Sequence, residues 1–358
     1  MKITILTGLG EDTEFSSNIC LARALRVFGH DIWLVGPDYD DTRTGKQVQQ
    51  TKEADVILHD VPYPYFYSYQ EILDVSPWLP DVIFAIDPRG ALNGEKPTGI
   101  ISCFYSTDNH RAGELHLRLI KEGQYDIVFV GQGAYLPFFE DSAPIVQVIW
   151  PAVEASRFPD DIHDEPVCDI VFVGHSGIAN GDLQAKGQRY DGQPPSYDYA
   201  ERAEFLLRLS DDFDVRIYES VWQTPDFCRT LQKGRIGFNR SILHDCSIRN
   251  FEVMAAGRPL VADDICLPPN LARFRDLMRD DFYSWGICSL LYPSLYRPFY
   301  PNFGIEYAYV KKIIRDLLDG SQKRKHMGTN ARQYVLDYHT WKNRAEQVTK
   351  VLNGGKND

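Results

Sequence analysis

The sequence predicts an α/β protein built from two doubly wound domains. Short apolar runs without strict polar alternation recur along the chain, as in strands that are buried on both faces of a parallel sheet. Amphipathic stretches separate these runs, and alternating strands and helices are typical of doubly wound sheets. The 358 residues exceed one ordinary domain, and a Pro- and acid-rich stretch interrupts the pattern near the middle.

The first domain is expected over residues 1–152. Its predicted strands are KITILTG, DIWLVGP, ADVILHD, DVIFAID, GIISCFY, YDIVFVG and PIVQVIW. A helix is predicted between the first two strands, with one apolar face and Gly29 at its end. That face consists of Ile19, Leu21, Ala24, Leu25 and Phe28. The segment GAYLPFFEDS is predicted to be a further helix that packs on the sheet.

The second domain is expected over residues 166–332, after a boundary at 153–166. Its predicted strands are VCDIVFVG, FDVRIYES, KGRIGFN and RPLVADD, and its predicted helices are YAERAEFLLRLS and IRNFEVMAAG. Residues 333–353 are predicted to form a final helix after a glycine-containing break at HMGTN. Loops are predicted at residues 177–196, which are rich in Gly, Pro and Gln, and at residues 292–303, which are rich in Tyr and Pro.

Composition excludes several classes of partner. The formal net charge of -12 argues against nucleic acid and anionic membranes, which require a field of basic charge.

Seven cysteines are scattered singly, which indicates free thiols in a reducing compartment. A basic and then apolar leader is missing at the N-terminus, and no apolar run approaches the ~20 residues of a membrane span, so a cytoplasmic protein is expected. The histidines form no metal-ligand pattern, and no metal is expected.

The most informative stretch is DCSIRNFEVMAAGRPLVADD. Asp245 and Ser247 are candidate N-caps of a helix that begins near Arg249, and Gly257 is its predicted end. The helix start follows a buried strand, at the sheet edge where open α/β sheets bind ligands. Free N–H groups and the helix dipole favour a diphosphate there, and Arg249 adds positive charge.

Glu252 lies one turn into the same predicted helix, where it could accept hydrogen bonds from ribose hydroxyls. A purely structural alternative fits the spacing equally well. In that alternative Asp245 caps the helix, while Arg249 and Glu252 form a surface pair at i, i+3.

Three further residues of the second domain are candidate phosphate contacts. Gly174 and His175 end its first predicted strand, and Arg240 follows the strand RIGFN. The alternatives are a solvated loop histidine and an ordinary surface arginine.

Two loops of the first domain are candidates for contact with a ligand, either a sugar or a hydroxyl-bearing acceptor. Gly8 and Gly10 lie between the first strand and first helix, where glycine permits close approach of a ligand. Asp108 and His110 follow the strand GIISCFY, and a carboxylate or imidazole there could accept the proton of a hydroxyl. The alternative is a turn made by Ser, Asp and Asn with a capping role.

The motif resembles the donor-site signature of the group 1 glycosyltransferases, most closely their branch resembling the spore-maturation protein CgeB. That branch has the pattern Ser-x-Arg-x-Phe-Glu-x-x-Ala-x-Gly, matched by Ser247, Arg249, Phe251, Glu252, Ala255 and Gly257. KGRIGFNRS resembles the strand before the motif, and VCDIVFVGHS resembles the first strand of the donor domain. VIWPAVEASRF resembles the interdomain link, and NARQYVLDYHTWKNRAEQV resembles the terminal helix.

The resemblance implies a GT-B fold, in which two Rossmann-like domains face a cleft and the C-terminal helix crosses back to the N-terminal domain. It implies a hexosyltransferase-like enzyme (EC 2.4) that uses a nucleotide sugar, such as a UDP- or GDP-sugar, with no cofactor or metal and with retention of configuration. Glu252 takes the ribose-binding position and Arg249 the phosphate-binding position. The chain departs from the pattern eight residues before Glu252, where relatives have a second Glu and this chain has His244; Asp245 is the candidate substitute.

Two alternatives remain at this stage. One is a nucleotide-sugar epimerase or hydrolase of the same architecture. The other is a GT-B protein without transferase activity that acts as a sensor or assembly factor. The acceptor (a glycan, a protein or a small molecule), the donor and the oligomeric state, which includes a homo-oligomer, are not specified by the sequence.

Overall fold

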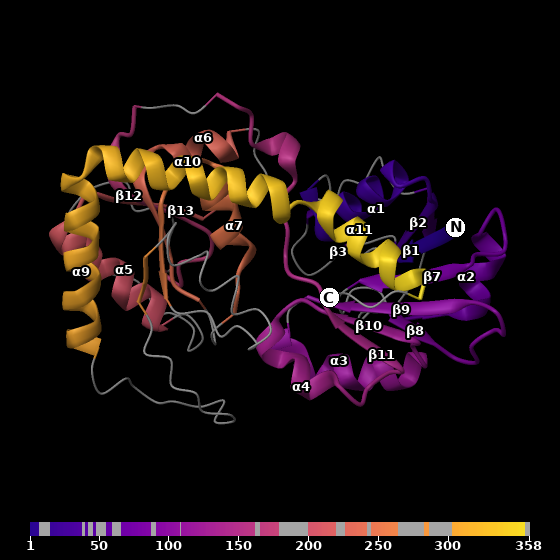
Figure 1. The fold of residues 1–358 in the computed structure, drawn as a ribbon. Coiled ribbons are helices and arrows are strands. Elements are labelled where there is room, and N and C mark those ends of the chain that lie inside the picture. Colours follow the sequence, from indigo (N-terminus) through magenta and orange to yellow (C-terminus); the bar gives the residue numbers. More distant parts are fainter. Residues whose placement is uncertain are drawn as a thin grey trace. The chain divides into compact units, whose positions relative to one another are not determined.

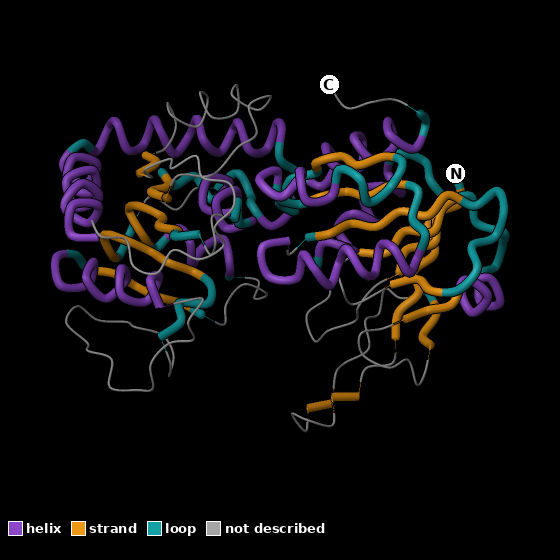
Figure 2. The backbone as a smooth tube through the Cα atoms, turned by 90° about the horizontal axis from the view of Figure 1, so that it is seen from below, coloured by secondary structure: helices purple, strands orange, loops and turns teal. Residues whose placement is uncertain are grey.

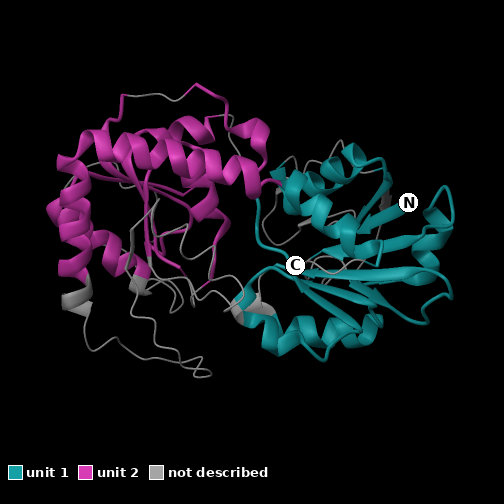
Figure 3. Ribbon diagram, viewed as in Figure 1, with its two compact units in different colours: residues 1–152, 341–358 teal, residues 153–340 magenta. Residues whose placement is uncertain are grey.

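The computed structural model describes residues 1–6, 15–37, 40–41, 46–47, 55–58, 66–86, 91–107, 109–161, 165–178, 200–219, 226–241, 245–263, 283–285 and 303–354. The chain divides into two compact units, shown in Figure 3. Unit 1 comprises residues 1–152 and 341–358, and unit 2 comprises residues 153–340.

In the described part of unit 1, seven strands form a parallel sheet in the order β11-β10-β9-β7-β1-β2-β5 (Figure 1). Their bounds are β1 (Lys2–Leu6), β2 (Asp31–Pro37), β5 (Val56–Leu58), β7 (Val82–Ile86), β9 (Ile101–Ser106), β10 (Ile127–Val130) and β11 (Ile145–Val148). Each lies within one of the apolar runs predicted to be strands, except that β9 extends one residue beyond its run to Ser106, so these predictions are confirmed. A short parallel pair, β6 (Phe66–Ser68) and β8 (Ala91–Asn93), lies outside this sheet.

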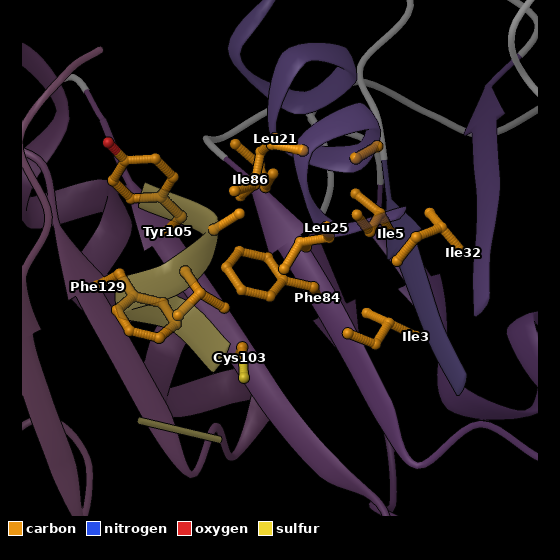
Figure 4. Packing of buried hydrophobic residues seen from close by; sticks show 14 of the residues in the cluster. Ile3, Ile5, Leu21, Leu25, Ile32, Phe84, Ile86, Cys103, Tyr105 and Phe129 are labelled. Carbon is orange, nitrogen blue, oxygen red and sulfur yellow. The ribbon is translucent and has the colours of Figure 1, made fainter. Parts of the chain in front are cut away.

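Helices cover both faces of the unit 1 sheet, as expected of a doubly wound domain. On one face, α1 (Ser17–Val27) and α11 (Trp341–Leu352) pack over side chains such as Ile5 and Phe84 (Figure 4). Phe84 stacks on Phe129 with ring centroids 5.5 Å apart. On the other face, α2 (Tyr69–Val75), α3 (Asn109–Gly123) and α4 (Leu136–Phe139) contribute to a second core.

In the described part of unit 2, five parallel strands follow the order β13-β12-β14-β15-β16. Figure 2 draws the strands of both sheets in orange. Their bounds are β12 (Cys168–Val173), β13 (Val215–Tyr218), β14 (Gly234–Asn239), β15 (Leu260–Asp263) and β16 (Tyr283–Trp285). The first four were predicted; the sequence analysis missed β16.

The helices of unit 2 also lie on both faces of its sheet. α5 (Ala200–Asp212) and α9 (Phe303–Asp319) share a core with one face. On the other face of the sheet, α6 (Phe227–Gln232) and α7 (Ile248–Ala255) pack on the strands. Helix α10 (Ser321–Tyr338) packs against α7.

The C-terminal helix differs from its prediction. The predicted break at HMGTN is wrong, because α10 runs through it and ends at Tyr338. A Cβ on Gly328 would lie 2.2 Å from the carbonyl oxygen of Gly257, so this glycine permits close approach of α10 to the end of α7. The break occurs at His339–Thr340 instead, and the predicted helix over 333–353 is divided between α10 in unit 2 and α11 in unit 1.

The helix within GAYLPFFEDS is also shorter than predicted. It forms a 3₁₀ turn at Gly133–Tyr135, followed by α4. Of the two predicted loops, 179–196 and 292–302 lie outside the described residues.

The described cysteines are free and buried: Cys20, Cys103, Cys168, Cys228 and Cys246. Burial raises the pKa of the Cys103, Cys168 and Cys228 thiols, which suits a packing role. Cys266 and Cys288 fall outside the described ranges. Among the helices that the structure describes, none is long and apolar enough to span a membrane.

Candidate functional site

Helix α7 forms the base of the candidate site. Ser247 is its N-cap, because the Ser247 side chain accepts a hydrogen bond from the backbone N–H of Arg249 at 3.2 Å. The helix ends at Ala255, followed by Gly257 with a positive φ, as predicted.

Two contacts hold the start of α7 at the carboxyl end of β14. A Cβ on Gly237 would lie 2.1 Å from Val253 Cγ1, so the absence of a side chain lets the helix pack closely on the strand. Asn239, at the end of β14, donates a buried hydrogen bond of 2.7 Å from Nδ2 to Oδ1 of Asn250. The helix N-terminus therefore lies at the edge where parallel α/β sheets bind ligands.

Glu252 lies between two arginines. Its Oε2 is 2.7 Å from Arg249 Nη1, and its Oε1 is 3.8 Å from Arg157 Nη1. The exposed fraction of the side chain is 7% for Glu252, 12% for Arg249 and 8% for Arg157. The i, i+3 pair expected by the structural alternative does form, but it is buried and is not a surface pair.

Both guanidinium groups lie near the ring of Phe227, a buried residue of α6. The Cζ atom is 4.2 Å from the ring centroid for Arg157 and 5.1 Å for Arg249. Contact with this aromatic ring adds a cation–π attraction for each guanidinium group and restricts where the two groups lie.

The Arg249–Glu252 contact is an ion pair without hydrogen-bond alignment. Among the described residues, Arg249 Nη1 and Glu252 Oε2 are both buried and make no hydrogen bond. Burial lowers the pKa of the Arg249 guanidinium, an effect that the Glu252 carboxylate opposes. A buried polar atom without a hydrogen bond is costly, and such groups often mark a ligand site. The same guanidinium faces the turn after β12, since its Nε and Nη2 atoms are 3.7 Å from where a Gly174 Cβ would lie.

That turn is held by two residues from neighbouring elements. Glu219, which follows β13, accepts hydrogen bonds from the backbone N–H (2.8 Å) and the hydroxyl of Ser176. Its Oε1 is also 4.0 Å from His175 Nδ1, and the His175 side chain is 62% exposed. Arg202 of α5 donates from Nη1 to the carbonyl oxygen of His175 and from Nε to that of Arg240, each at 2.8 Å. The loops after β12 and β14 are thereby joined.

The other predicted donor-site residues are placed less directly. Arg240 is buried, and its guanidinium lies over the Phe205 ring of α5 with Cζ 4.8 Å from the centroid, so a phosphate contact stays a prediction. Asp245 is buried just before the N-cap. His244 lies outside the described residues.

The predicted acceptor residues are not tested by the structure. Asp108, Gly8 and Gly10 lie outside the described residues. His110 is in the first turn of α3, but its side chain is not described.

The structure describes one contact between β9 and α3, the elements on either side of Asp108 in the sequence. Ser106 ends β9, and its Oγ is 2.5 Å from Nδ1 of His116, a fully buried residue of α3. Burial lowers the pKa of His116 to about 4, so the imidazole is neutral near pH 7.

Sequence reasoning missed Arg157, Phe227, Arg202 and Glu219. Glu219 lies near the carboxyl end of the predicted strand FDVRIYES and could have been found by the rule that ligands bind at the carboxyl edge. The other three lie in a predicted link or within helices, and no local pattern marks them. Among the described residues, no group of three or more His, Cys, Asp or Glu side chains could hold a metal ion.

Comparison with known proteins gives one family and a set of similar folds. Residues 199–350 match a family model described as glycosyl transferase-like, a range that contains α7 and spans under half of the chain. No curated protein matches the sequence.

Similar solved structures span almost the whole chain. Sucrose-phosphate synthase from Thermosynechococcus elongatus has a TM-score of 0.60 at 12% identity, covering 99% of this chain and 98% of that one. An alpha-glucosyltransferase in complex with UDP-glucose and DNA containing an abasic site has a TM-score of 0.61 at 11% identity, covering 98% and 99%. The catalytic domain of starch synthase IV from Arabidopsis thaliana, bound to ADP and acarbose, has a TM-score of 0.55 at 10% identity, covering 99% and 98%. At these identities the similarity shows the fold: the chain has the GT-B fold of two Rossmann-like domains.

Proposed function

We propose that this protein transfers a sugar from a nucleoside-diphosphate sugar to an acceptor, with its donor site at the N-terminus of α7. One observation carries the proposal: Arg249 and Glu252 lie together at the carboxyl edge of a parallel sheet, and Arg249 Nη1 and Glu252 Oε2 are buried without a hydrogen bond among the described residues. The match of residues 199–350 to a glycosyl transferase-like family supports transfer chemistry.

Each residue of the site has a proposed role. The backbone N–H groups at the start of α7 and the guanidinium of Arg249 bind the diphosphate, and Glu252 accepts hydrogen bonds from ribose hydroxyls. The turn at Gly174 and His175 lies beside Arg249 and faces the same phosphates. When the glycosidic bond to the donor breaks, the leaving diphosphate gains charge, which the helix dipole and Arg249 stabilise.

The acceptor is proposed to bind to unit 1. Asp108 and His110, which flank the start of α3, are the candidate proton acceptors for its hydroxyl. Metal independence, retention of configuration and membership of the branch resembling CgeB rest on the sequence resemblance and stay predictions.

Two rivals use the same donor site. A sensor or assembly factor would bind a nucleotide sugar without turning it over, and an epimerase would turn it over without an acceptor. Release of nucleoside diphosphate from a nucleotide sugar, even slowly in the absence of acceptor, would exclude the first rival.

The test begins with thermal unfolding of the protein in the presence of UDP-, GDP- and ADP-sugars, because a tight ligand raises the unfolding temperature by mass action. For the nucleoside of the nucleotide that binds, Glu252→Ala should weaken binding by about 1.5–3 kcal/mol, the usual contribution of charged hydrogen bonds. Isothermal titration calorimetry measures this difference. Glu204→Ala, which removes an exposed Glu of α5 that pairs with Arg208, is the matched control. Equal affinity of Glu252→Ala and the wild type would contradict the assignment.

A further inference from the structure

Resting on the proposed donor site, we propose that nucleotide binding exchanges one ion pair for two new contacts. In the structure Glu252 is shared between Arg249 and Arg157. On binding, the diphosphate takes Arg249 from Glu252, the ribose takes the released Oε2, and Arg157 keeps Glu252 in place. Arg157 is then a positioning residue of the site.

The geometry of the shared carboxylate supports the exchange. The 2.7 Å contact between Arg249 Nη1 and Glu252 Oε2 lacks hydrogen-bond alignment, and both atoms are buried without another hydrogen bond among the described residues. A phosphate oxygen and a ribose hydroxyl would each supply the aligned partner that these two atoms lack. Separating Arg249 from Glu252 therefore breaks no aligned hydrogen bond between these two atoms. Arg249 Nη1 and Glu252 Oε2 each gain a hydrogen bond to the nucleotide.

Charge supports the exchange as well. A buried carboxylate cannot be left unpaired without a large cost, so Glu252 needs a second cation before it can release Arg249. Arg157 Nη1 already lies 3.8 Å from the other carboxylate oxygen. Its guanidinium is held over the Phe227 ring, which keeps it beside Glu252 whatever Arg249 contacts.

Arg249 also lies beside the turn that is proposed to face the phosphates. Its Nε and Nη2 atoms are 3.7 Å from where a Gly174 Cβ would lie.

The exchange makes the two halves of a nucleotide cooperative. Pyrophosphate that occupies Arg249 frees Glu252, so a nucleoside should bind more tightly in its presence, and linkage requires the converse. The wild-type protein is titrated with uridine, adenosine and guanosine, each with and without saturating pyrophosphate. We expect the affinity for the accepted nucleoside to rise about fivefold or more.

Two variants test the residues that carry the coupling. Glu252→Gln should bind pyrophosphate about three- to tenfold more tightly than the wild type, because no carboxylate competes for Arg249, and should bind the nucleoside more weakly. Arg249→Gln should bind pyrophosphate more weakly than the wild type and the nucleoside more tightly. Neither variant should show coupling. Glu204→Gln, which removes the exposed pair with Arg208 at 2.8 Å, should leave both affinities and the coupling unchanged.

Arg157→Gln separates the positioning role from a general structural one. Without Arg157, Glu252 keeps Arg249 as its partner, so pyrophosphate affinity and the coupling should fall together. Arg157→Lys should restore both in part, because it returns the charge.

The outcomes separate two kinds of failure. If UDP, ADP, GDP and pyrophosphate all fail to bind the wild type, the proposed donor site is wrong. If they bind but pyrophosphate does not tighten nucleoside binding, or if Glu252→Gln weakens pyrophosphate binding, the site stands and the exchange is overturned. The wild-type titration decides this even if a variant does not fold.

Discussion

At the scale of single residues, the buried groups of this protein differ in how they are compensated. Glu252 is held by two arginines, whereas His116 is buried as a neutral imidazole with Ser106 Oγ 2.5 Å from its Nδ1. The first arrangement places an acidic side chain between two basic ones. The second keeps the His116 imidazole of α3 neutral, and it makes stability depend on pH.

Burial lowers the pKa of His116 to about 4, below its ordinary value of 6.5. Between these pH values the unfolded chain binds more protons than the native protein, so the free energy of unfolding rises with pH. The contribution is fully present above pH 6.5 and is lost as pH falls toward 4, to a total of about 3 kcal/mol. Urea unfolding at intervals from pH 4 to 7 measures it. His116→Gln should flatten this part of the profile, and a variant that keeps the full slope would assign the slope to other groups.

At the scale of elements, α7 and α10 show how glycine sets the distance between packed elements. Gly237 lets α7 approach β14, and Gly328 lets α10 approach the end of α7. Arg332 of α10 is buried and donates to the carbonyl oxygens of Ala255 and Phe158. Helix α7, the helix of the proposed donor site, is therefore held by a strand on one side and by a helix on the other.

Gly328→Ala tests this packing. In an isolated helix the change should stabilise by about 1 kcal/mol. Here the added Cβ would lie 2.2 Å from the backbone oxygen of Gly257, so we expect a net loss of about 1–3 kcal/mol in the free energy of unfolding. Thr329→Ala, at the adjacent exposed position, should stay within about 0.5 kcal/mol of the wild type. Denaturant unfolding of both variants compares them, and a more stable Gly328→Ala would refute close packing at this point.

At the scale of the whole molecule, the chain passes between the units twice, at residues 152–153 and 340–341. The two passages are joined, because Val153 N donates to His339 O at 2.9 Å and Val153 pairs with Thr340. Arg344 of α11 is buried and donates to the carbonyl oxygens of Trp150 and Pro151, which fastens the last helix to unit 1.

The proposed division of labour between the units has its own test. His110→Gln should leave nucleoside-diphosphate affinity nearly unchanged and lower transfer by roughly 10²–10⁴-fold if His110 is the general base. Asp108→Asn is measured in parallel to identify which of the two accepts the proton. Arg249→Ala should weaken nucleotide binding and also slow transfer. Binding is measured by calorimetry and transfer by product formation. Loss of nucleotide binding in a folded His110→Gln variant would place the donor site differently.

The sequence alone determined the strands of both sheets except β16, the helix α7 between Ser247 and Gly257, and the placement of Arg249 and Glu252 on it. These features depend on apolar periodicity and on caps, which act over a few neighbouring residues and are visible in the letters.

Only the tertiary structure decided that Glu252 is buried and Arg249 largely so, that Arg157 and Phe227 complete their surroundings, and that Arg202 joins two loops. It also decided that Gly328 marks a helix contact and not a helix break. Each of these depends on residues that are far apart along the chain and that meet only when the sheet and its helices are packed. Local propensity does not predict such contacts, because it depends only on neighbouring residues in the sequence. The contacts stabilise a segment only once the core has formed.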